Sequence, residues 1–164
     1  MSGDEPLARL SAILRTDIVV SASEQAGGGP LAIGWATVEL DRAVAELGAA
    51  LRLPADRFVD APASVALGAR CLVAAGVLTG GIALLLLEPN TEGRLAATLA
   101  RHDEGPAAVW LAVEDPAEAV ASLGRGGHPV SPPQAGPYGG ERLVDGPRYG
   151  PHLLVVEGPG TIRA

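Results

Sequence analysis

The sequence repeats one pattern of apolar and acidic residues, and this repeat limits the possible folds more than any other feature. Residues 33–47 (IGWATVELDRAVAEL) align without a gap with residues 109–123 (VWLAVEDPAEAVASL). In each copy an apolar stretch leads through acidic residues to apolar residues at helical spacing. Acidic residues favour a helix start, and Pro116 suits the first turn. Each copy therefore predicts a strand followed by an amphipathic helix.

A second pair of similar segments closes each copy. Residues 84–89 (LLLLEP) resemble residues 153–158 (LLVVEG), and both predict an apolar strand. Between the helix and this last strand, each copy has room for two more strands. These strands are expected at 57–60 and 69–78 in the first copy, and at 128–131 and 141–144 in the second. Each copy is thus predicted to run strand, helix, strand, strand, strand.

Segments outside the repeat predict two further helices. Residues 6–15 have apolar side chains at helical spacing, and so do residues 91–102, for which Thr91 is the candidate N-cap. A strand is expected at 17–21 and a Gly-rich hinge at 26–30. The expected organisation is an N-terminal extension with its hinge (1–29), a first module (30–90), a linking helix (91–106), a second module (107–158) and a tail (159–164).

An uncharged run of 17 residues covers positions 71–87. A membrane-spanning helix needs about 20 such residues, and Thr79, Gly80 and Gly81 in the middle of the run favour a turn. The run therefore predicts a hairpin of two buried strands rather than a membrane span, with the strands at 71–78 and 82–87. The acidic N-terminus does not resemble a signal peptide, so we expect a cytoplasmic protein with no membrane partner.

The composition excludes several chemistries. All 12 of the Lys and Arg residues are arginines, so Schiff-base chemistry, a pyridoxal anchor and a P-loop lysine are impossible. Cys71 is the single cysteine, which rules out an internal disulfide and a zinc site built from thiolates. The net charge of -7 and the scattered arginines argue against nucleic acid as a partner.

Two tandem βαβββ modules joined by a helix resemble the vicinal oxygen chelate superfamily of glyoxalases, epimerases, extradiol dioxygenases and bleomycin-resistance proteins. The segments that carry this resemblance are 33–43, 86–89, 92–106, 109–115 and 153–157. Together they cover most of the stretch from residue 31 to residue 158. The resemblance implies an α+β fold whose modules form a curved mixed sheet around a cavity, with a short N-terminal helical extension. It also implies a homodimer.

The resemblance further implies four metal-ligand positions on the cavity face, where enzymes of the superfamily use His, Glu or Gln. The matching residues in this chain are Ala32, Leu85, Ala108 and Leu154. Apolar side chains supply none of the N, O or S donors that a divalent metal needs. A shift of the alignment by one residue reaches only apolar residues as well. We therefore expect no metal and no other cofactor.

Strand alternation predicts what occupies the cavity instead. Trp110 shares a face with Ala108, and His152 shares a face with Leu154, which gives an apolar cavity with one aromatic wall and one imidazole. Trp110 either stacks against a ligand or fills the space left by the metal site. His152 is either a general base or a partly buried strand residue.

A loop rich in proline and glycine, residues 134–140, is expected to cover the mouth of the cavity. Arg142 and Arg148 flank this loop, and they either hold a ligand's carboxylate or phosphate or are ordinary surface arginines. The candidate ligand-binding residues are therefore Trp110, His152, Leu85, Leu154, Tyr138 and Arg142. No catalytic residue is assigned.

Three functions remain open at this point. The first is a metal-free binding protein that sequesters an apolar small molecule, as in the bleomycin-resistance branch. The second is a metal-independent lyase or isomerase, such as an epimerase or cyclase, with His152, Glu141 or Tyr138 as acid or base. The third is a metal-dependent lyase or dioxygenase whose ligands are misassigned. The four apolar positions favour the first function, and thus a protein that is not an enzyme.

Overall fold

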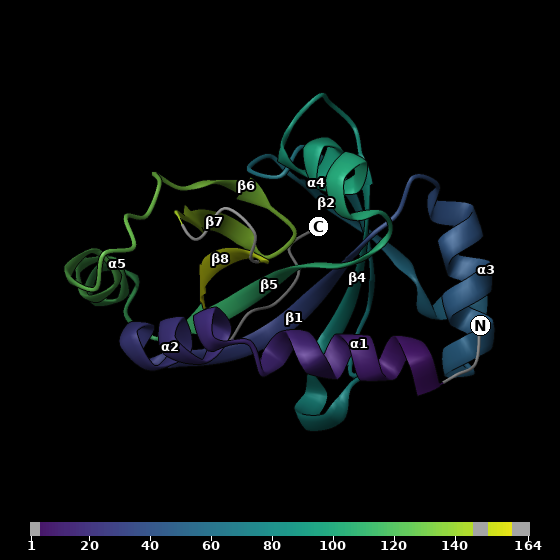
Figure 1. Ribbon diagram of the computed structural model, residues 1–164, viewed down its shortest axis with the longest axis horizontal. Coiled ribbons are helices and arrows are strands. Elements are labelled where there is room, and N and C mark those ends of the chain that lie inside the picture. Colours follow the sequence, from purple (N-terminus) through teal and green to yellow (C-terminus); the bar gives the residue numbers. More distant parts are fainter. Residues whose placement is uncertain (1–3, 146–150, 159–164) are drawn as a thin grey trace.

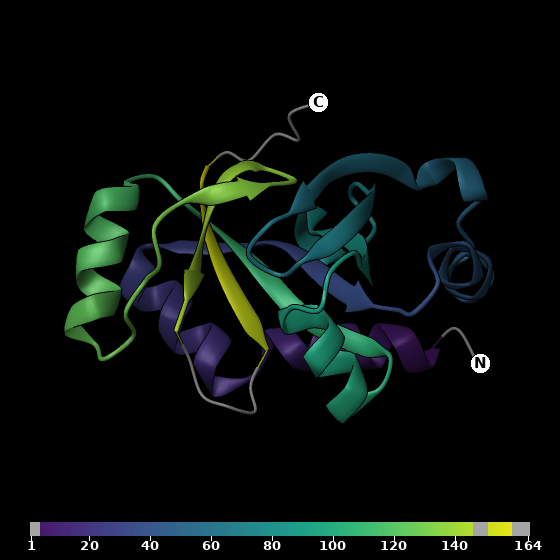
Figure 2. The same cartoon turned by 90° about the horizontal axis from the view of Figure 1, so that it is seen from above.

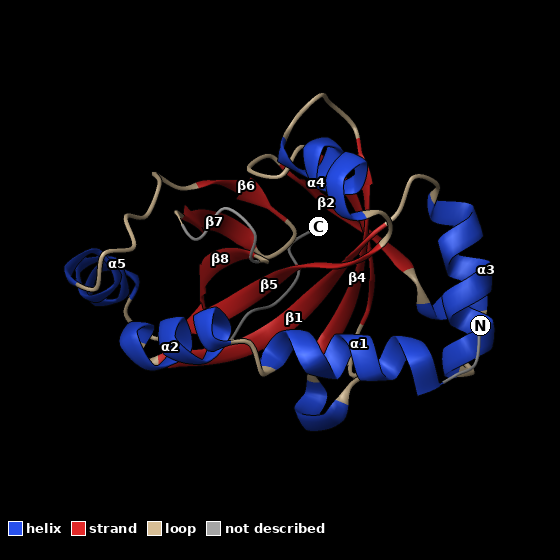
Figure 3. Cartoon of the chain, in the orientation of Figure 1, coloured by secondary structure: helices blue, strands red, loops and turns tan. Residues whose placement is uncertain are grey.

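The computed structural model describes residues 4–145 and 151–158, which contain two similar units of five elements each (Figure 1 and Figure 3). The first unit consists of β1 (Gly28–Ala36), α3 (Leu40–Leu51), β2 (Val59–Ser64), β3 (Ala69–Ala74) and β4 (Ala83–Pro89). The second consists of β5 (Gly105–Val113), α5 (Pro116–Arg125), β6 (Gln134–Gly136), β7 (Gly139–Val144) and β8 (His152–Glu157). The predicted α+β fold with two tandem βαβββ modules is confirmed.

Three more helices complete the described chain. α1 (Asp4–Leu14) and α2 (Asp17–Ala26) precede the first unit, and α4 (Arg94–His102) joins the two units. Two 3₁₀ turns, η1 (Ala55–Arg57) and η2 (Thr79–Gly81), lie within the first unit. Among the residues that the structure describes, no helix has the length and apolar character needed to cross a membrane.

All eight strands belong to one sheet, in the order β2-β3-β4-β1-β5-β8-β7-β6. β1 and β5 lie antiparallel at its centre, and each is parallel to the last strand of its own unit. The sheet curves until its two ends meet, where the Val65 N–H donates a hydrogen bond of 3.0 Å to the Ala135 carbonyl. Figure 2 shows the two units side by side from above. The result is a nearly closed sheet with one convex and one concave face.

The alternation of side chains along the strands separates two apolar cores. Ile33 and Trp35 of β1 belong to the core on the convex face, which α1, α2, α3 and α5 cover. Ala32 and Ala36 of the same strand belong to the core on the concave face. α4 adds the buried Leu95 to this second core. The concave face is thus lined by small and branched apolar side chains.

Residues 17–21 do not form the predicted strand. They begin α2, whose buried residues Val19, Ala22 and Ala26 repeat at helical spacing. Gly27 ends this helix with a left-handed backbone (φ 68°), which glycine adopts without strain. β1 begins at the next residue, Gly28, so a strand follows the helix directly where a hinge was expected.

The second unit differs from the prediction in one strand. Of residues 128–131, only Val130 pairs with another strand, through an isolated bridge to Val144. The short strand β6 instead lies at Gln134–Gly136, inside the segment that was predicted to be a loop. Prolines at 129, 132 and 133 have no N–H to donate to a neighbouring strand, which explains why regular pairing starts only after them.

The remaining boundaries are close to those expected. β3 and β4 form the predicted hairpin, with Cys71 opposite Leu87. β2 extends to Ser64, beyond the predicted end at residue 60. α4 is capped by the backbone of Gly93 rather than by Thr91. Arg148 and the expected tail, 159–164, lie outside the described residues.

Candidate functional site

The four positions that the family resemblance assigns to metal ligands lie on neighbouring strands of the concave face. Gly34 pairs with Leu85 on one side and with Ala108 on the other. Trp110 pairs with both Ala32 and Leu154. Ala32, Leu85, Ala108 and Leu154 are each 0% exposed. A metal therefore does not fit this donor set, because four buried apolar side chains offer it no lone pair. Nor do the described residues bring three His, Cys, Asp or Glu side chains together elsewhere.

A carboxyl group is buried on the same concave face. Glu141 of β7 is 0% exposed. Its Oε2 accepts a hydrogen bond of 2.6 Å from the Ser64 hydroxyl, and its Oε1 accepts one of 3.0 Å from the indole Nε1 of Trp110. These three side chains, which we call the interior polar trio, come from β7, from β2 and from β5. The trio thus joins the two units inside the nearly closed sheet.

Burial dominates the electrostatics of Glu141. Removal from water raises the pKa of its carboxyl, because the apolar surroundings disfavour the charged form. The hydrogen bonds from Ser64 and Trp110 act in the opposite direction, since they stabilise the carboxylate. The net shift is upward. An elevated pKa is the property that a general acid or base near neutral pH requires.

Two glycines make room for the interior polar trio. A Cβ atom at Gly34 would lie 2.9 Å from Cζ3 of Trp110 and 2.6 Å from Cδ1 of Leu87. A Cβ atom at Gly136 would overlap the carboxyl group of Glu141. Close packing of this kind is typical of a protein interior. Trp110 itself is 0% exposed, so in this arrangement it fills the concave face rather than presenting a surface for stacking.

Tyr138 and Cys71 also lie in the concave core. Burial raises the pKa of the Cys71 thiol to about 12, and Glu141 contributes to this shift as a nearby negative charge. Burial likewise raises the pKa of Tyr138 to about 12. Both groups are therefore neutral at physiological pH, and the cysteine is not the reactive thiolate that nucleophilic catalysis needs.

His152 lies at the start of β8 and connects the concave face to the linking helix. Its Nε2 is 2.7 Å from the Thr98 hydroxyl of α4. Burial lowers the pKa of the imidazole, and the charges of Arg94 and His102 lower it further. The ring is therefore neutral at pH 7, and it is half-buried at the edge of the core rather than in contact with Glu141.

The structure separates the remaining candidates. Leu85 and Leu154 lie in the concave core with Trp110 and Tyr138. Arg142 follows Glu141 directly on β7, so its side chain lies on the opposite, convex face. The structure thus brings Trp110, Tyr138, Leu85 and Leu154 together, places His152 at their margin and excludes Arg142 from the face they share.

Sequence reasoning missed the interior polar trio as a unit. Glu141 was considered as an acid or base, but its partner Ser64 was not considered at all. One signal was present: Glu141 occupies the same parity on its strand as the apolar Leu143, which predicts an inward-facing carboxyl. Nothing in the sequence around Ser64 indicates that this hydroxyl reaches a residue 77 positions away.

Comparison with known proteins identifies relatives by structure alone. No protein-family model matches the sequence, and no curated protein sequence matches it either. Among solved structures, a hypothetical protein from Bacillus halodurans C-125 matches with a TM-score of 0.66 and 17% identity, over 84% of this chain and 99% of the other. Methylmalonyl-CoA epimerase from Mycobacterium tuberculosis matches with a TM-score of 0.66 and 20% identity, over 79% and 87% of the two chains.

A further match is a variant of Streptomyces coelicolor methylmalonyl-CoA epimerase in complex with 2-nitronate-propionyl-CoA. It has a TM-score of 0.62 and 22% identity, and the alignment covers 79% of this chain and 96% of the other. At these identities the likeness shows the fold. The chain has the glyoxalase-like fold of these structures.

Proposed function

We propose that this glyoxalase-like chain is a metal-independent binding protein that takes a largely apolar small molecule into the concave face of its sheet. The observation that carries the proposal is the Glu141 carboxyl, which is wholly buried among apolar side chains with the Ser64 hydroxyl as its hydrogen-bond partner. Burial of a carboxyl is unfavourable unless it is neutral or well hydrogen-bonded. A polar group retained at such a place, with an apolar lining around it, is typical of a small-molecule site.

The lining suggests the chemistry of the ligand. Leu85, Leu154 and Leu143 offer apolar contact, while Glu141 and Ser64 together provide one hydrogen-bond donor and several acceptors. A hydrophobic molecule with a single hydroxyl, carbonyl or amino group complements this arrangement. Among the described residues, the buried side chains of this face include no arginine, so a strongly anionic ligand is disfavoured there.

Entry of a ligand requires a rearrangement, because Trp110 and its neighbours are fully buried. The seam between β2 and β6 is the natural place for it. In the described part of the chain, the Val65 N–H crosses this seam to the Ala135 carbonyl, and the Ser64 hydroxyl crosses it to the Glu141 carboxyl. We infer that a ligand replaces the Ser64 or Trp110 hydrogen bond to Glu141 when the seam opens.

The test is a thermal-shift screen of hydrophobic natural products, combined with native mass spectrometry of the protein as purified. We expect at least one compound to raise the melting temperature of the wild-type chain. This stabilisation should disappear in Glu141→Leu. It should persist in Arg142→Ala, a matched control because that residue lies next to Glu141 on the opposite face. A screen without any stabilising compound, or equal stabilisation of Glu141→Leu, would contradict the proposal.

A second candidate function is proton transfer by Glu141, as in an epimerase. Two observations favour it: the raised pKa of the Glu141 carboxyl, and the likeness of the fold to methylmalonyl-CoA epimerases. Incubation with methylmalonyl-CoA in D₂O tests it. Deuterium incorporation at the carbon next to the thioester, lost in Glu141→Gln and retained in Arg142→Ala, would establish catalysis. No incorporation above the protein-free rate would exclude this substrate.

The homodimer that the family resemblance implies stays a prediction. Light scattering on the purified chain tests it directly, and a monomer at micromolar concentration would contradict it.

A further inference from the structure

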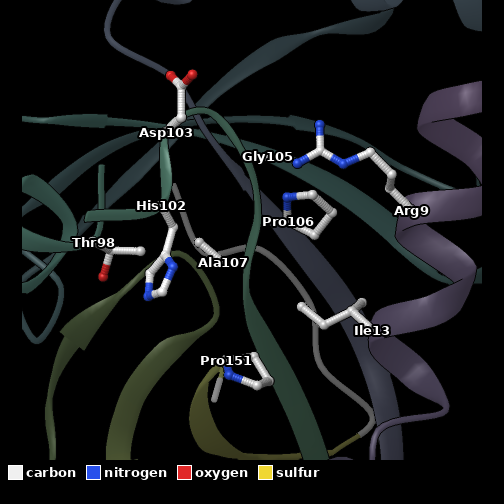
Figure 4. A pocket seen from close by; sticks show the side chains of 9 residues that line it. All are labelled: Arg9, Ile13, Thr98, His102, Asp103, Gly105, Pro106, Ala107 and Pro151. Atoms are coloured by element: carbon white, nitrogen blue, oxygen red, sulfur yellow. The ribbon is translucent and has the colours of Figure 1, made fainter. Parts of the chain in front are cut away.

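A pocket lies where the central strand β5 begins, and none of its lining residues belongs to the interior polar trio. It has a volume of about 250 Å³ and opens between α1, α4 and the beginning of β5. Figure 4 shows the side chains that line it. Those that matter for the argument are Arg9, His102, Ile13, Pro106, Ala107 and Pro151.

Arg9 is held at this pocket by three features. Its Nη2 donates a hydrogen bond of 3.1 Å to the Glu104 carbonyl. Its guanidinium carbon lies 5.0 Å from the centre of the Trp35 ring, which is a cation–π distance. A Cβ atom at Gly105 would overlap the guanidinium, so the glycine leaves the space that the group occupies. A guanidinium has five N–H donors, and the described residues engage it through one hydrogen bond.

The nearby carboxylates are engaged elsewhere and do not neutralise Arg9. Asp103 accepts a hydrogen bond of 2.8 Å from the Glu104 N–H, and Figure 4 shows its carboxyl pointing away from the pocket. The Glu104 carboxylate accepts hydrogen bonds from Arg42, Thr37 and the Val38 N–H. Among the described residues Arg9 therefore has no ion-pair partner, although Asp103 also lines the pocket and the chain as a whole carries -7.

His102 supplies a second polar group from another side. It lies in the last turn of α4, and Figure 4 shows its ring and the Arg9 guanidinium on different sides of the pocket. Between them, Ile13, Pro106 and Ala107 form an apolar wall. The pocket thus combines a planar cation and a ring N–H with an apolar lining, and its residues come from α1, α4 and β5 and from the residue that precedes β8.

We propose that this pocket binds a small aliphatic carboxylic acid. The carboxylate pairs with the two-pronged guanidinium of Arg9, a geometry that matches carboxylate better than a single ammonium does. The His102 ring lies on the other side of the pocket, beyond the carboxylate. The alkyl chain lies against Ile13, Pro106, Ala107 and Pro151. None of these residues belongs to the interior polar trio, so the site is independent of the proposed function on the concave face.

The test is an NMR titration of the ¹⁵N-labelled chain with hexanoate, with hexanamide as the uncharged counterpart. We expect saturable shifts for the amides of Gly105 and Ala107 with hexanoate, and much weaker binding of hexanamide. Arg9→Gln should weaken hexanoate binding about tenfold or more, as expected for loss of a charge-assisted hydrogen bond. Arg9→Lys should have an intermediate effect. Arg125→Gln removes an exposed arginine of α5 and should leave the affinity unchanged.

Several outcomes would overturn the proposal. They are the absence of saturable shifts, equal affinity for hexanamide, or unchanged affinity in Arg9→Gln. Inorganic phosphate that competes as strongly as hexanoate would also overturn it, because the site would then recognise charge alone. Arg9 contacts Trp35, so circular dichroism of each variant must first show the wild-type fold. If Arg9→Gln does not fold, Arg9→Lys replaces it, and weaker hexanoate binding than in the wild type is expected, because an ammonium lacks the two-pronged geometry.

Discussion

The indole of Trp110 donates its hydrogen bond to Glu141 from a strand of the same unit, while the opposite oxygen of that carboxyl accepts from Ser64 of the other unit. The largest side chain of the concave core is therefore fixed by a group that also ties the two units together. Loss of the carboxyl would leave both donors unpaired in an apolar interior, which costs about 1–3 kcal/mol for each group.

The protonation of Glu141 should give stability a characteristic pH dependence. Burial raises the pKa of this carboxyl in the folded chain above its unfolded value of about 4.3. The folded chain then holds the proton more tightly, so the contribution to stability is fully present below pH 4.3. It is lost as the pH rises through the folded pKa. Urea unfolding of the wild type and of Glu141→Gln between pH 4 and pH 8 measures this pH dependence. As the pH rises, the free energy of unfolding of the wild type should fall relative to that of the variant. A pH-independent difference would contradict the shift.

Replacement of Gly34 by alanine should destabilise the fold, although it adds only one methyl group. A Cβ atom there would press on Trp110 and Leu87, so Gly34→Ala is expected to lower the free energy of unfolding by about 1–3 kcal/mol. Gly29→Ala is the matched control on the same strand, because a Cβ atom at that position meets no atom within 4 Å. Chemical denaturation gives both values. If contact with the indole causes the destabilisation, Gly34→Ala should cost less unfolding free energy in a Trp110→Phe background. An equal cost in that background would show another cause.

His152 should make the chain sensitive to mild acid. Its pKa in the folded chain lies below the unfolded value of about 6.5, because burial and the charges of Arg94 and His102 disfavour the imidazolium. Stability is therefore complete above pH 6.5 and falls as the pH drops through the folded pKa. Melting temperatures between pH 8 and pH 5 should fall more steeply for the wild type than for His152→Gln.

A second variant separates the hydrogen bond of His152 from its titration. Thr98→Val removes the partner of Nε2 but leaves the ring beside the core. This variant should be less stable at every pH and should keep the steep fall in acid. If the melting temperatures of the wild type and of His152→Gln fall equally between pH 8 and pH 5, the lowered pKa of His152 is refuted.

Uptake of divalent metal should remain well below one ion per chain. Ala32, Leu85, Ala108 and Leu154 provide no donor atoms, and the Glu141 carboxyl is engaged by Ser64 and Trp110. Elemental analysis after dialysis against zinc, nickel, manganese or iron measures the content. Stoichiometric metal that survives a chelator wash would show that the ligands lie elsewhere in the chain.

Much of the fold follows from the sequence because the repeat encodes it twice. The gapless match of residues 33–47 with residues 109–123 gives both strand and helix of each unit, and the structure has β1, α3, β5 and α5 at these places. α2 was predicted as a strand because residues 17–21 contain a short apolar run, and such a run occurs both in strands and in buried helices. β6 was not predicted because its three residues follow Pro132 and Pro133 and include Gly136, a composition typical of a loop, and only the partner strand β7 holds them in a sheet.

The candidate site was harder to predict than the fold. The concave position of Trp110 and Leu154 follows from alternation, since a strand has a fixed period of two. The contact between Ser64 and Glu141 does not, because it depends on how far the sheet curves. That curvature brings together β2 and β6, which are the first and last strands of the sheet. No local sequence pattern in either segment predicts that they meet.

The meeting of β2 and β6 has a consequence for the behaviour of the chain in concentrated solution. An open sheet ends in strands whose unpaired N–H and C=O groups can recruit another chain and start aggregation. Here the two strands that would be such ends face each other, and the Val65 to Ala135 hydrogen bond already uses one donor and one acceptor. The curvature of the sheet thereby keeps its edge strands from pairing with another chain. If the seam opened, both edge strands would become accessible for such pairing.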